Sequence, residues 1–250
     1  MATREDRPHH SPHHHHPDPV LITLTEPKSA ASEAFRTLRT NIQFAGLDQP
    51  CRSIVVTSAG PEEGKTTSAA NFGVVAAQAG SRVCVIDSDL RRPSLHRLFR
   101  LDNARGLTTA LVEGLSFAEV AQPTAIPNLS ILPSGPLPPN PAELVGSHRM
   151  RECLQAATES FDLVLCDSPP VMAVGDAAAL AAQCDGVIFV IRVGTMAHDV
   201  LRRVVDQIEA VKGRILGVLL NRADPRRDGY YYYYQTYQRY YGTDDGSAKR

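Results

Sequence analysis

The sequence of 250 residues contains no tryptophan, and it contains no tyrosine before position 230. Tyrosines that pack in a core would be scattered over strands and helices. Their confinement to one polar segment therefore favours a use of the phenolic hydroxyl itself, although aromatic runs also occur in low-complexity, disordered segments. The eight tyrosines are Tyr230, Tyr231, Tyr232, Tyr233, Tyr234, Tyr237, Tyr240 and Tyr241.

The chain also lacks a charge excess, a long apolar run and paired cysteines. Its net charge of −1 at pH 7 argues against nucleic acid as a partner. No apolar segment approaches the ~20 residues that a membrane-spanning helix needs, which predicts a soluble cytoplasmic protein that reaches membranes only through a partner. No metal-binding spacing joins the five cysteines, which are expected to be reduced: Cys51, Cys84, Cys153, Cys166 and Cys184.

The composition predicts one folded domain with a tail at each end. At 43% hydrophobic residues, the chain can bury one sizeable α/β core. Residues 1–19 carry six of the nine histidines among proline and aspartate, and we expect them to be disordered. A natural metal-binding tail and an expression tag both remain open for them. Residues 20–222 are predicted to form the domain, and residues 223–250 a flexible tail.

An apolar run, residues 53–57, leads into a loop that fits the pattern GxxxxGK[ST] with alanine in place of the first glycine. Backbone N–H groups of such a loop, and the positive end of the helix that follows, cradle phosphate oxygens. Lys65 would reach the β and γ phosphates of ATP, and the Thr66 hydroxyl would bind Mg²⁺. The residues assigned to nucleotide binding here are Ala59, Gly60, Pro61, Glu62, Glu63, Gly64, Lys65, Thr66 and Thr67.

Two acidic sites follow apolar runs elsewhere in the chain. Asp87 and Asp89 come after the run 83–86, and Asp167 comes after the run 163–166. Because ligands collect at the carboxyl ends of parallel strands, these carboxylates would converge on a metal ion and the γ phosphate. A single aspartate after a strand is usually a turn or a helix cap. Two such sites beside a phosphate loop favour the metal site.

Apolar runs alternate with helical segments, as a mostly parallel sheet flanked by helices requires. The last predicted strand ends at Asn221, which is placed either to contact the adenine base or to end the strand in a turn. Strands are predicted at residues 53–57, 83–87, 129–132, 163–167, 187–193 and 215–221, and helices at 66–78, 143–159 and 197–211.

Together these motifs resemble the cytoplasmic catalytic domain of bacterial tyrosine kinases, the polysaccharide-assembly kinases built on a P-loop fold of the partition-ATPase type. The matching features are the loop around Lys65, the DxDxR sequence of residues 87–91, the run ending at Asp167 with Pro170, and the tyrosine cluster. A proline-rich connection at 135–144 and an ExxRxxR sequence formed by Glu33, Arg36 and Arg39 agree with them. The resemblance extends from about residue 20 to the tyrosines.

The resemblance implies transfer of the γ phosphoryl group from Mg-ATP to tyrosine hydroxyls, first those of the chain's own cluster. Thr66 would bind Mg²⁺ directly and Asp167 through water. Asp87 and Asp89 would divide the remaining metal and base duties, in an order that the sequence leaves open. Arg91 would steady the phosphates or an adjacent subunit.

The resemblance also implies partners. Glu33, Arg36 and Arg39 would join subunits into a homo-oligomer, expected as a ring in this family, although charges at this spacing also suit a solvated helix face. A membrane-embedded polysaccharide co-polymerase would activate the kinase, and a tyrosine phosphatase would reset it. The regulated process would be the assembly and export of exopolysaccharide or capsule.

A positioning or partition ATPase is the competing interpretation. Such relatives carry an additional lysine at the second position of the phosphate loop, where this chain has Gly60. They also leave the tyrosine cluster without a role. A scaffold for iron–sulfur clusters is excluded because it would need a paired-cysteine motif.

Overall fold

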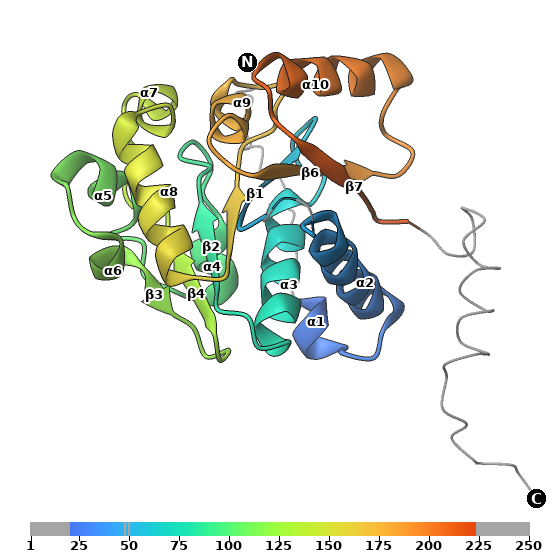
Figure 1. The fold of residues 1–250 in the computed structure, drawn as a ribbon, viewed down its shortest axis with the longest axis horizontal. Coiled ribbons are helices and arrows are strands. Elements are labelled where there is room, and N and C mark those ends of the chain that lie inside the picture. Colours follow the sequence, from blue (N-terminus) through green and yellow to red (C-terminus); the bar gives the residue numbers. More distant parts are fainter. Residues whose placement is uncertain (1–20, 48, 50, 224–250) are drawn as a thin grey trace, which may run out of the picture.

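The computed structural model describes residues 21–223, apart from residues 48 and 50 (Figure 1). Its sheet has seven strands in the order β3-β4-β2-β5-β1-β6-β7. Neighbouring strands are parallel except for β3, which runs antiparallel to β4. The predicted fold class is thus confirmed. The histidine-rich segment and the tyrosine cluster lie outside the described residues.

Six of the strands were expected from the sequence to within one residue at each end. The additional strand, β3, consists of two residues, one of them a proline, and lies at the edge of the sheet, where a missing N–H is tolerated. It is too short to give a periodic signal. The strands are β1 Ser53–Ser58, β2 Val83–Asp87, β3 Gln122–Pro123, β4 Leu129–Leu132, β5 Leu163–Asp167, β6 Gly186–Arg192 and β7 Ile215–Asn221.

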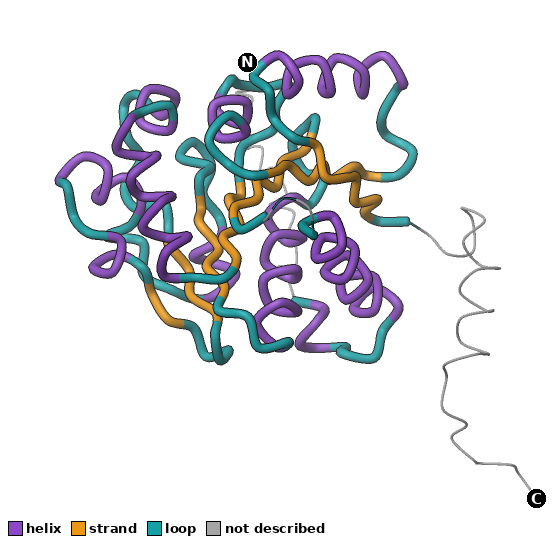
Figure 2. Tube along the Cα trace, viewed as in Figure 1, coloured by secondary structure: helices purple, strands orange, loops and turns teal. Residues whose placement is uncertain are grey.

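Helices cover both faces of this sheet, as Figure 2 shows with the strands between two groups of helices. One hydrophobic cluster joins one face to residues of α2, α3 and α4, and a second joins the other face to α5, α6 and α7 to α10. The helices are α1 Ile22–Thr25, α2 Ala30–Ala45, α3 Lys65–Gln78, α4 Leu95–Phe99, α5 Leu107–Glu113, α6 Phe117–Val120, α7 Pro141–Val145, α8 His148–Ser160, α9 Asp176–Ala181 and α10 His198–Ala210. None of the helices in the described ranges is long and apolar enough to cross a membrane.

The single helix predicted over residues 143–159 is wrong, because the chain forms α7 and α8 there. Gly146 ends α7, and its N–H donates to the carbonyl of Ala142. Ser147 then caps α8, since its Oγ accepts the N–H of Met150 at 3.1 Å. Serine is a preferred N-cap, so the Gly-Ser pair is the signal that separates the two helices.

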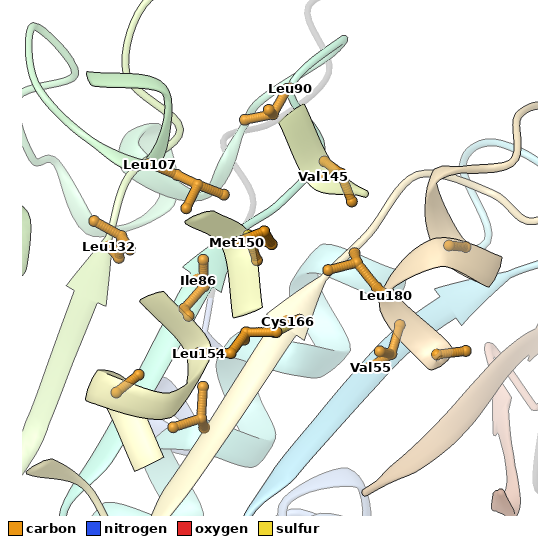
Figure 3. Packing of buried hydrophobic residues seen from close by; sticks show 14 of the residues in the cluster. Val55, Ile86, Leu90, Leu107, Leu132, Val145, Met150, Leu154, Cys166 and Leu180 are labelled. Atoms are coloured by element: carbon orange, nitrogen blue, oxygen red, sulfur yellow. The ribbon is translucent and has the colours of Figure 1, made fainter. Parts of the chain in front are cut away.

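The central strands are buried on both sides, which explains why their sequences are continuous apolar runs rather than alternating ones. Figure 3 shows Ile86 of β2 and Cys166 of β5 near Leu154 of α8, and Val55 of β1 near Leu180 of α9. Because the core encloses these strands fully, the polar side chains at their carboxyl ends are buried as well.

Candidate active site

The phosphate loop connects β1 to α3 and turns into the helix at Gly64. Gly64 has a positive φ of 94°, and a Cβ at this position would collide with the side-chain amide of Asn221. Glycine is therefore required both by the backbone conformation and by the close approach. No side chain caps α3, so its first N–H groups point to a ligand position, as phosphate-binding helices require.

Asn221 fastens this loop from the end of β7. Its Nδ2 donates to the carbonyl of Glu63 at 2.8 Å, and its Oδ1 accepts the N–H of Arg222 at 2.9 Å. The same side chain thus forms a local turn and holds the phosphate loop. The last strand of the domain is thereby tied to the nucleotide site.

Glu63 stabilises the loop through a hydrogen bond with its backbone. Its buried carboxylate accepts the N–H of Ala59 at 3.3 Å. Burial raises the pKa of Glu63, and hydrogen bonds from the backbone of Ala59 and Gly60 oppose that change. Sequence analysis assigned Glu63 only as one member of the loop, whereas the structure gives its side chain a supporting contact.

Lys65 lies among the acidic side chains at the carboxyl ends of β2 and β5. Its Nζ is 3.0 Å from Oδ2 of Asp89 and 3.6 Å from Oδ1 of Asp167, and its side chain is only 12% exposed. Burial acts against the lysine charge, but Asp167 and Asp89 outweigh it, so the pKa of Lys65 is raised. The lysine is therefore charged and ready to exchange carboxylate oxygens for phosphate oxygens.

Asp87 and Asp167 are neighbours in the register of β2 and β5, and both are fully buried. Oδ2 of Asp87 accepts the N–H groups of Ser94 and Leu95, at 3.1 and 2.9 Å. Its Oδ1 and both oxygens of Asp167 have no hydrogen-bond partner among the described residues. Burial raises the pKa of both carboxyl groups, that of Asp87 to about 7 with a further contribution from the charge of Asp167.

These oxygens fit a magnesium ion. A buried polar atom without a partner costs about 1–3 kcal/mol, and native proteins rarely keep several together without a bound ion or water. Mg²⁺ takes oxygen ligands and is usually held by one or two carboxylates together with substrate phosphates. Thr66 lies at the same place, with its Oγ1 3.5 Å from Oγ of Ser94 and 3.5 Å from Nζ of Lys65. Thr66, Asp87 and Asp167 are thus the residues that would hold the ion.

Asp89 is held in a different way from Asp87. Its Oδ1 accepts the N–H groups of Arg91 and Arg92, at 3.3 and 3.0 Å, while its Oδ2 faces Lys65. The side chain of Arg91 pairs with Asp176 of α9, for which the sequence gave no prediction. An aspartate at a helix start resembles an ordinary first-turn acid, which explains why the sequence gave no signal.

The ExxRxxR residues lie on α2, whose Ile42 packs in the same hydrophobic cluster as residues of α3. Arg36 donates to Glu33 at 2.7 Å and to the carbonyl of Pro27 at 2.6 Å. Arg39 lines a cavity of about 220 Å³ together with Phe72 and other residues, and its Nε is buried without a hydrogen bond among the described residues. The structure therefore pairs Glu33 with Arg36 and places Arg39 beside this cavity.

A parallel sheet with a phosphate loop, a buried lysine and acidic side chains at the strand ends defines a P-loop nucleotide-binding protein. In agreement, the family model described as "AAA domain" matches residues 52–220. The chain is 42% identical to the tyrosine-protein kinase YwqD of Bacillus subtilis (strain 168) over 216 residues, which cover 86% of this chain and 91% of that kinase.

Solved structures agree. The kinase domain of the Escherichia coli tyrosine kinase ETK superposes with a TM-score of 0.77 at 30% identity, covering 86% of each chain. The chain therefore belongs to the bacterial tyrosine kinases and is a protein-tyrosine kinase. The cell division ATPase MinD of Pyrococcus furiosus has a TM-score of 0.58 at 22% identity and covers 69% of this chain and 74% of its own, a likeness of fold alone.

Proposed function

We propose that this kinase transfers the γ phosphoryl group of Mg-ATP to the tyrosine cluster of another copy of the chain. The observation that supports the proposal is the contact of Asn221 with the phosphate loop, because the described part of the chain ends two residues later, at residue 223. Tyr230 follows nine residues and Tyr241 twenty residues after Asn221. At about 3.3–3.6 Å per extended residue, the cluster can reach roughly 30–70 Å, far enough for the active site of a neighbour.

The roles of the site residues follow from the loose transition state of phosphoryl transfer, in which positioning and charge neutralisation dominate. Lys65 would leave the carboxylates and contact the phosphate oxygens. Thr66 would bind the metal directly and Asp167 through water, and a bound Mg²⁺ would neutralise charge on the phosphates. Asp87 and Asp89 would divide the remaining duties, one binding the metal and the other accepting the proton of the tyrosine hydroxyl.

The tyrosine cluster would also act as a switch for assembly. Each phosphotyrosine adds about −1.5 to −2 charges, so four of them change a subunit by about −6 to −8. Tails gathered around a ring joined through Glu33, Arg36 and Arg39 would then repel one another and release the subunits. A tyrosine phosphatase would reset the cycle. A membrane-embedded co-polymerase would recruit the cytoplasmic kinase to the inner face of the membrane, where the cycle would regulate assembly and export of exopolysaccharide or capsule.

The decisive experiment mixes two defective chains. Lys65→Met provides a full tail without activity, and a chain truncated after Asp228 provides activity without tyrosines. We expect phosphotyrosine on the Lys65→Met chain when both are incubated with Mg-ATP, because transfer occurs between copies. A Lys65→Met chain that stays unmodified would refute transfer between subunits.

Two further measurements complete that experiment. Lys28→Met, which changes an exposed lysine outside the site, is the matched control and should retain self-phosphorylation. Light scattering of phosphorylated and unphosphorylated full-length protein tests the release step. Equal masses for the two forms would eliminate charge-driven release. Hydrolysis of ATP without any phosphotyrosine would instead indicate a switch of the partition-ATPase type.

A further inference from the structure

An ion pair with one buried partner joins the loop after β2, which carries Asp89, to the start of α9. Nε and Nη2 of Arg91 lie 2.9 and 3.3 Å from the two carboxylate oxygens of Asp176. Asp176 is fully buried, whereas the Arg91 side chain is 39% exposed. Two parallel N–H···O bonds between charged groups are strong and fix the relative orientation of the partners.

Arg91 is connected to Lys65 of the phosphate loop through Asp89. The N–H groups of Arg91 and Arg92 donate to Oδ1 of Asp89, and Oδ2 of Asp89 is 3.0 Å from Nζ of Lys65. Asp89, Arg91 and Arg92 lie between β2 and α4, outside any helix or strand. The position of Asp89 therefore depends on how Arg91 is held.

The aspartate end is fixed to the core. Asp176 begins α9, in which Ala177 and Leu180 are fully buried. The segment between β5 and α9 is bonded to β1 through the N–H of Val171, which donates to the carbonyl of Ser58 at 2.9 Å. Asp176 is thus a rigid anchor, and the loop that bears Asp89 is attached to it through Arg91.

We infer that Asp176 is a positioning residue of the kinase, which holds Arg91 so that Asp89 faces Lys65. This inference rests on the proposed role of the site in phosphoryl transfer. A purely structural pair would not need to be bonded to the turn that carries Asp89. Arg82 and Asp162, at the opposite end of β2 and β5, form an exposed pair of similar length, and within the described ranges neither is hydrogen-bonded to the phosphate loop or to Asp87, Asp89 or Asp167, so the pair supplies the control.

The kinetic test compares Asp176→Asn, Arg91→Gln, the double variant and the control Asp162→Asn. Misplacement of a catalytic group by about 1 Å can cost about 100-fold in rate. We expect Asp176→Asn and Arg91→Gln to lower kcat for tail phosphorylation by about 10- to 100-fold, with KM for ATP changed less than about twofold. The double variant should be no slower than the slower single variant, because both act through one contact.

One further variant, Arg91→Lys, keeps the test informative. Arg91→Lys preserves the charge without the bidentate geometry and should give an intermediate kcat. If Asp176→Asn fails to fold, Arg91→Lys still tests the inference. Asp162→Asn should match the wild type. A kcat of Asp176→Asn within twofold of the wild type, or a raised KM at unchanged kcat, would overturn the inference.

Amide hydrogen exchange supplies a readout that needs no nucleotide. In Asp176→Asn, the amides of Arg91 and Arg92 should exchange at least about fivefold faster, while the amide of Val171 keeps its wild-type rate. Unchanged exchange at Arg91 and Arg92 would also overturn the inference. A wild-type chain that forms no phosphotyrosine would contradict the proposed function instead, and the exchange result would still stand.

Discussion

The two ends of the central strands use charged residues in opposite ways. At the amino end, Asp162 bonds to Arg82 at 2.7 Å, and Oδ2 of Asp185 accepts the N–H groups of Arg52 and Ser53, both at 2.8 Å. At the carboxyl end, Asp87 and Asp167 are fully buried and keep oxygens that form no hydrogen bond with any described residue, although Oδ1 of Asp167 is ion-paired with Lys65 at 3.6 Å. The charged residues at the amino end stabilise the fold through hydrogen bonds, whereas the oxygens at the carboxyl end are available to a ligand.

The pKa values express the same difference. A hydrogen bond from Arg82 lowers the pKa of Asp162 to about 2, whereas burial raises that of Asp87 to about 7. Ionisation therefore favours folding at the amino end and opposes it at the carboxyl end. Active sites commonly keep such unfavourable arrangements because function needs them, at a cost in stability.

Among the variants of the two strand ends, Lys65→Met should have the largest effect on phosphorylation. It removes the side-chain cation within hydrogen-bonding distance of Asp89, and we expect phosphorylation to fall by at least about 10²–10³-fold. The fold should persist, because the loop adds little to the hydrophobic core. Phosphotyrosine formation and circular dichroism test both statements. Undiminished phosphotyrosine would show that the kinase activity does not depend on this loop.

Asp87→Asn should separate activity from stability. Activity should be lost with a metal ligand, but metal-free protein at neutral pH and above should gain about 1–3 kcal/mol in its free energy of unfolding, because a neutral amide replaces a carboxyl group whose ionisation is opposed by burial and by the charge of Asp167. Because the folded pKa of Asp87 is raised, stability is fully present below the ordinary carboxyl pKa and is lost as pH rises through about 7.

Urea denaturation in EDTA at several pH values measures this gain. The difference between Asp87→Asn and wild type should grow with pH across that range. A variant that is less stable than wild type at pH 8 would show that the buried carboxylate is satisfied in a way that the contacts do not reveal.

Changing Glu33, Arg36 and Arg39 together to alanine should have an intermediate effect. We expect a shift toward monomer in light scattering and a several-fold lower rate of tail phosphorylation, with monomer stability altered by no more than about 1 kcal/mol because the Glu33–Arg36 pair is partly exposed. If mass and activity both stay unchanged, the three residues form only a solvated face.

Asp162→Asn should have the smallest effect. Its folded pKa is depressed, so the stability that Asp162 contributes is present above its ordinary pKa of 3.8 and is lost as pH falls through about 2. The variant should be slightly less stable than wild type at pH 7 and equal to it at the acid limit, with normal kinase activity. Denaturant midpoints at both pH values test the sign, and a larger loss at acid pH would contradict it.

The sequence alone predicted the parallel strands, the phosphate loop and the acidic residues at the strand ends. These features depend on local patterns: continuous apolar runs for doubly covered strands, and Gly-Lys-Thr at the start of a helix. The break between α7 and α8 was also local, in Gly146 and Ser147, but the helical pattern on either side obscured it.

Only the tertiary structure decided which charged groups meet. Arg91 and Asp176 are 85 residues apart, and the crossovers of the sheet bring them together. Likewise, nothing near Asp167 in the sequence shows that its oxygens are buried without hydrogen bonds while Lys65 approaches. Local sequence determines backbone conformation and residue chemistry, but burial and the pairing of charges depend on segments distant in the chain, and those were fixed by packing.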